Sequence, residues 1–97
     1  MGDSLDRFFV LLERVPRLAD SGIWSKTAGS FDCDLYENAL GYLSSGEAHM
    51  ARFFAALWQG QNGSSSYYLF DVVEAAAVID PEWREIIRDW LADPFWP

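Results

Sequence analysis

The sequence predicts an all-α fold: one small domain over residues 1–97, built as a bundle of four to five short helices with an ordered loop around Trp24. Several segments repeat apolar residues at helical spacing, which is typical of helices that bury one face. Apolar residues make up 51% of the chain and aromatic residues 16%, enough to build a core. With 97 residues the chain is close to the commonest domain size, so we expect a single core.

The first helix is predicted before Pro16, which we expect to end it because proline cannot donate a backbone hydrogen bond. Asp3 or Ser4 is placed to cap its free amides. Its apolar face has the i, i+3, i+4, i+7 pattern and consists of Leu5, Phe8, Phe9 and Leu12.

A loop pinned by Trp24 is expected between Ala19 and Ser30, where glycine and serine break any regular pattern. A second helix is predicted after Asp32 or Asp34, with Gly41 weakening it by about 1 kcal/mol relative to alanine. Its apolar positions are Leu35, Ala39, Leu40 and Leu43.

The central helix has the clearest start signal in the chain. Ser44 and Glu47 have the spacing of a capping box, and Gly60 is placed to end the helix. Five residues fill one face between these signals: Met50, Phe53, Phe54, Leu57 and Trp58. The polar stretch 61–66 is predicted to be a flexible connection.

Two further helices are predicted towards the C-terminus. The first is expected to be capped by Ser65 or Ser66 and to bury Leu69, Val72, Val73 and Ala76. The second begins with Asp80 as N-cap, Pro81 at the first helical position and Glu82 in the first turn. Its apolar residues are Trp83, Ile86, Ile87, Trp90 and Leu91.

The net charge of −8 indicates which surfaces the chain avoids. Such a charge repels phosphate backbones and anionic lipids, so we expect no direct binding to nucleic acid and none to membranes. No apolar stretch is long enough to span a bilayer, and Cys33 is the single cysteine, so no internal disulfide can form. A cytoplasmic location is the expectation.

No catalytic constellation is recognisable, and we expect neither an enzyme nor a cofactor or metal. His49 is the single histidine, and no H-x-x-x-H, E-x-x-H or C-x-x-C spacing occurs. Cys33 lies between two aspartates whose charges disfavour the nucleophilic thiolate. A phosphate-binding loop requires a lysine or arginine nearby. None lies beside Gly60, Gly63 and the serines that follow.

Two features near the C-terminus predict a surface for a partner. Acidic residues spaced by three or four positions stack along one side of the last helix: Glu82, Glu85, Asp89 and Asp93. This acidic ridge has a spacing comparable with that of nucleic-acid phosphates, although a solvated helix face also explains it. Phe95 and Trp96 need burial, either on the chain's own core or on a partner.

Charge, aromatic content and the lack of catalytic motifs together favour a small acidic protein that binds another protein. We expect it to mask a basic nucleic-acid-binding site, by analogy with anti-CRISPR and other inhibitors made by phages or mobile elements. The alternative is a structural or adaptor subunit, including a homodimer. A third class is a ligand carrier with a pocket between helices, lined by Trp24, Trp58 and Trp83.

Overall fold

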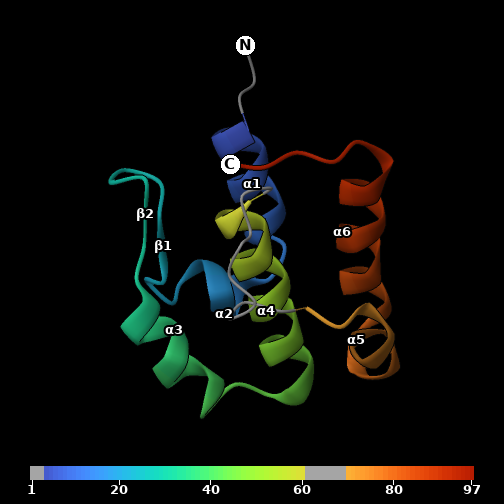
Figure 1. Cartoon of the computed structure of the whole chain (residues 1–97). Helices are drawn as coiled ribbons and strands as arrows, with labels where there is room; N and C mark the ends of the chain where they lie inside the picture. The colour runs from blue at the N-terminus through green and yellow to red at the C-terminus, as the bar shows by residue number, and fades with distance from the viewer. Residues whose placement is uncertain (1–3, 61–69) are drawn as a thin grey trace.

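The computed structural model describes residues 4–60 and 70–97. They form six helices and one hairpin of two short strands (Figure 1). In chain order these are α1 (Ser4–Leu12), α2 (Pro16–Ala19), β1 (Trp24–Ser25), β2 (Ser30–Phe31), α3 (Cys33–Leu40), α4 (Ser45–Gln59), α5 (Val72–Val78) and α6 (Pro81–Ala92). The predicted all-α class is confirmed, with α2 as a helix beyond the four to five expected.

Helix α4 is the centre of the arrangement, with α1 and α6 standing beside it and α5 at the foot of α6 (Figure 1). The chain after α6 crosses back to α1, so the C-terminus lies close to the N-terminal helix. The same view shows the hairpin and α3 on the opposite side of α4 from α6. The C-terminal tail therefore lies beside α1 (Figure 1).

The core is built around aromatic rings from different elements. Phe8 of α1 is fully buried and meets Phe54 edge to face, with ring centroids 5.5 Å apart. On the far side of α4, Phe53 meets Trp90 of α6 in the same geometry at 5.9 Å. Such pairs contribute about 0.5–1.5 kcal/mol each beyond the burial of their surface. Together they fix α1 and α6 on two sides of α4.

The predicted capping box of α4 is confirmed. The Ser44 hydroxyl accepts from the Glu47 amide at 3.2 Å, and the Ser44 amide donates to the Glu47 carboxylate at 3.0 Å. Gly60 follows the helix with a φ of 73°, which a residue with a side chain rarely adopts. Four of the five predicted face residues are buried and Trp58 is half-buried.

The prediction for Pro16 and the following loop was wrong in detail. Helix α1 ends at Leu12 without it, and Pro16 begins α2, because the first helical position needs no amide donor. The expected loop around Trp24 is an antiparallel hairpin that pairs Trp24 with Phe31. Trp24 is buried, so it does pin this segment, as predicted.

Asp32, rather than Asp34, caps α3, where its carboxylate accepts from the Leu35 amide at 3.0 Å. The helix ends at Gly41 instead of continuing to Leu43. Leu35 is exposed, and Tyr36 and Ala39 are the buried residues. Leu40 and Leu43 pack partly buried against the core, so Leu35 is the one predicted face residue that was wrong.

The predicted start and register of α5 were also wrong. Asp71 caps it, accepting from the Glu74 amide at 3.0 Å, and the buried residues are Ala75 and Ile79. Val72 and Val73, expected in the core, are exposed. The proposed caps Ser65 and Ser66, Leu69 and the stretch 61–66 lie outside the described residues.

Helix α6 begins as predicted, with Asp80 at the N-cap and Pro81 at the first position, although the Asp80 side chain makes no capping bond. Ile86 and Ile87 are buried, whereas Leu91 is exposed. Among residues 4–60 and 70–97, no helix is long and apolar enough to cross a membrane.

Candidate interaction surface

The acidic ridge of α6 is largely taken up in contacts within the chain. Asp89 accepts from Arg14 Nη1 at 2.8 Å, which ties α6 to the turn after α1. Glu85 pairs with Arg88 one turn further along the same helix. Glu82, at the start of α6, has no ion pair with any described residue.

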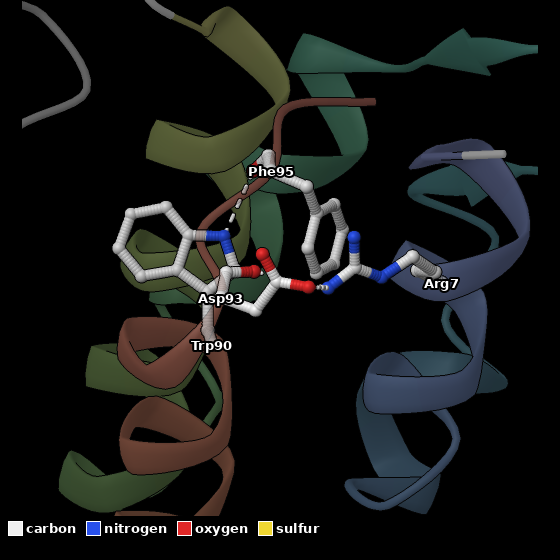
Figure 2. Close-up of polar contacts among 4 residues, drawn as sticks. All are labelled: Arg7, Trp90, Asp93 and Phe95. Carbon is white, nitrogen blue, oxygen red and sulfur yellow. Dashed lines mark hydrogen bonds and ion pairs between the residues drawn. The ribbon is translucent and has the colours of Figure 1, made fainter.

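Asp93 is the fourth ridge residue and belongs to a contact between the two ends of the chain (Figure 2). Arg7 Nη2 of α1 donates both to the Asp93 carboxylate at 3.1 Å and to its carbonyl oxygen at 2.9 Å. The same guanidinium lies over the Phe95 ring, 4.2 Å from its centroid. Trp90 Nε1 completes the arrangement by donating to the Phe95 carbonyl oxygen at 2.8 Å.

This arrangement decides where the aromatic tail docks. Phe95 is 6% exposed and packs into the chain's own core, beneath Arg7. It is therefore available to a partner only if the tail leaves its place. With Glu85, Asp89 and Asp93 beside arginines, the ridge presents a weaker negative field than its sequence spacing indicates.

Trp96 is the one predicted tail residue that faces outward, with 37% of its surface exposed. Its ring meets Trp90 edge to face at 5.6 Å and lies beside Gly60, at the end of α4. An apolar hollow of about 370 Å³ opens next to it. We call Trp96 and this hollow the C-terminal corner; the hollow is lined by Phe53, Ala56, Leu57, Phe70, Val72, Ile87, Trp90, Leu91 and Trp96.

A second apolar surface lies on α5, and the sequence analysis missed it by placing Val72, Val73 and Ala76 in the core. We call it the α5 face, and its residues are Val72, Val73, Ala76 and Ala77, all exposed. Glu74 is the single charged residue of the helix, and its carboxylate is 3.3 Å from His49 Nε2. The signal available in the sequence was the run of small and apolar residues without solvent-facing charge.

His49 is buried on α4, against α5. Its Nδ1 atom is buried without a hydrogen-bond partner among the described residues, and its Nε2 atom faces the Glu74 carboxylate. A cavity of about 690 Å³ beside it is also lined by Arg52 and Asp71. No three His, Cys, Asp or Glu side chains of the described residues come close enough to hold a metal ion. Cys33 is a free, exposed thiol.

The three tryptophans proposed to line a ligand pocket do not lie together. Trp24 and Trp58 both pack on Phe8, at 6.1 and 5.3 Å between centroids. Trp83 packs at the other end of α4, where an added Cβ on Gly46 would lie 3.3 Å from its ring. Gly46 and Trp58 are twelve residues apart, which is about 18 Å along a helix. A single pocket between the three rings was therefore a wrong prediction.

Comparison with known proteins finds no relative of this chain. No known protein family, curated protein or solved structure matches the chain.

Proposed function

We propose that this chain is a small acidic protein-binding module whose contact surface is the C-terminal corner. The observation that carries the proposal is the half-exposed Trp96 at the edge of an apolar hollow with aromatic walls. Tryptophan is enriched at interface positions that dominate binding, especially where a pocket lies beside it. Beside the corner, the Trp90 indole donates to the Phe95 carbonyl oxygen, and Phe95 is buried in the core, which ties down the tail next to Trp96.

The charge of the chain supports a narrower form, in which the partner is basic and the chain masks its nucleic-acid-binding site. The net charge is −8, and several exposed acids form no ion pair with a described residue. They are spread over four elements or their ends: Glu13, Asp20, Asp34, Asp80 and Glu82. The attraction for a basic partner therefore comes from the whole surface rather than from the α6 ridge.

Affinity capture tests both forms. The tagged full chain is used as bait in a cell lysate, bound proteins are eluted with rising salt, and they are identified by mass spectrometry. We expect a basic nucleic-acid-binding protein that is released by salt, since screening removes long-range attraction. With the purified partner, the chain is expected to displace a labelled oligonucleotide, and raising the salt is expected to weaken binding at least about tenfold.

The variant Trp96→Ala is expected to lose this capture, whereas the matched variant Tyr42→Ala keeps it. Tyr42 is also an exposed aromatic residue, but it lies between α3 and α4, away from the corner. Equal capture by the two variants would remove the corner from the proposal. A partner that stays bound at high salt, or that releases no oligonucleotide, would contradict the masking form.

A further inference from the structure

The exposed side of α5 lacks the charges that normally keep a surface helix soluble. Val73 is 79% exposed, and Ala76 and Ala77 beside it are exposed too. A helix that is apolar on nearly all sides is usually buried on nearly all sides. The described residues leave this side of α5 open to another molecule.

The same side of the molecule also has a hollow that an apolar side chain of another molecule can enter. A hollow of about 210 Å³ lies between α5 and α6, next to the α5 face. Val72, Ala76 and Ile87 contribute to its apolar lining, and the exposed Arg84 and Arg88 stand at its edge. A protruding valine and an apolar hollow on one surface satisfy the reciprocal contacts that a twofold interface requires.

The charges beside these two features are complementary. Asp80, the N-cap of α6 two residues after the end of α5, is exposed and forms no ion pair with a described residue. The hollow is lined by two arginines and no acid, and Arg88 already pairs with Glu85 of the same helix. Arg84 has no ion pair within the described residues, although the chain has about two acids for each basic residue. A second copy brings an acid to this hollow together with an apolar side chain.

We infer that two copies of this chain associate through the α5 face, with Val73 of each copy seated in the α5–α6 hollow of the other. This gives a surface to the homodimer that the sequence analysis kept as an alternative. The interface adjoins the C-terminal corner without using Trp96. Val72, Ile87 and Leu91 line both hollows, whereas Trp96 lines that of the corner alone. Trp96→Ala therefore tests partner binding, and variants at Val73 test self-association.

Sedimentation equilibrium of the purified full chain at micromolar concentration tests the inference. We expect a mass of twice 11.0 kDa. The association is expected to strengthen as salt rises, because two copies with a charge of −8 repel each other and salt screens that repulsion. Binding of a basic partner at the corner has the opposite salt dependence, which separates the two proposals.

Variants at Val73 test whether this side chain enters the α5–α6 hollow of the second copy. Val73→Lys places a positive charge against Arg84 and Arg88 and is expected to weaken association at least about 100-fold. Val73→Glu is expected to weaken it less, because its charge opposes that of the arginines. The matched control is Val10→Lys, at a valine of α1 that is 63% exposed, and it is expected to leave the dimer intact.

Adding Arg84→Glu to Val73→Lys restores attraction across the interface and is expected to recover much of the lost association. A misfolded variant cannot be rescued in this way. A monomeric wild-type chain at every salt concentration would overturn the inference. So would equal effects of lysine at positions 73 and 10, or a double variant no better than Val73→Lys alone.

Discussion

At the scale of single residues, Arg7 stabilises the C-terminal tail through more contacts than its ion pair with Asp93. Both side chains of that pair are well exposed, at 40% and 79%, so the salt bridge alone contributes only about 0.2–1 kcal/mol. Arg7 also donates to a backbone carbonyl and covers the Phe95 ring. A charge over an aromatic face contributes a further 0.5–1 kcal/mol, approximately, at a partly exposed site.

We therefore predict unequal effects from the two partners. Arg7→Ala is expected to lower the free energy of unfolding by about 1–2 kcal/mol, because all three contacts are lost. Asp93→Asn removes only the charge and is expected to cost less than about 0.5 kcal/mol. Urea unfolding of both variants measures the difference, with Arg14→Ala as the control for an arginine whose described contact is one ion pair. Equal losses for Arg7→Ala and Asp93→Asn would show that the ion pair dominates.

At the scale of elements, Gly46 shows how tightly α4 packs on the segment that joins α5 to α6. A Cβ added there would lie 3.1 Å from the Val78 carbonyl oxygen and 3.3 Å from the Trp83 ring. Both distances are shorter than ordinary van der Waals contact. The close packing therefore leaves little room for a side chain at position 46. The capping-box pattern around Gly46 does not reveal this.

Gly46→Ala is predicted to destabilise the protein by about 1–3 kcal/mol, because overpacking outweighs the gain of up to about 1 kcal/mol in helix propensity. Gly41→Ala is the matched control, with a single close contact of 3.3 Å to the Asn38 carbonyl oxygen, and we expect a change within about 0.5 kcal/mol. Thermal and urea unfolding give both values. A stabilised Gly46→Ala variant would mean that α5 and Trp83 yield without strain.

Among the elements, the starts of helices could be predicted from the sequence, whereas the buried side of α5 could not. Ser44 with Glu47, and Asp80 with Pro81, predicted helix starts correctly because each signal lies within a few consecutive residues: a capping box in α4 and a proline at the first helical position in α6. The register of α5 depends on which side meets α4, and local spacing does not contain that information. Glu82, Glu85 and Asp89 were correctly placed on one helix, whereas Asp93 follows the end of that helix. Asp93 and Asp89 meet arginines 86 and 75 positions away in the chain.

At the scale of the whole molecule, the C-terminal tail joins the last helix to the first. Phe95 is buried between α1 and the end of α6, where Arg7 lies over its ring and Trp90 binds its carbonyl oxygen. The first and last helices are otherwise held together mainly through α4 and the exposed pair of Arg14 with Asp89. The tail therefore closes the structure rather than extending from it.

Deleting residues 94–97 is predicted to lower the free energy of unfolding by about 3–5 kcal/mol, the usual loss on removing a buried phenylalanine. That is a large share of the roughly 5–15 kcal/mol that stabilises a typical domain. Trp96→Ala alone is expected to cost less, because its ring is partly exposed. Urea unfolding compares the two variants, and hydrogen exchange should show that the deletion exposes amides of α1 as well as α6. Unchanged protection of α1 would contradict a tail that holds both ends of the chain.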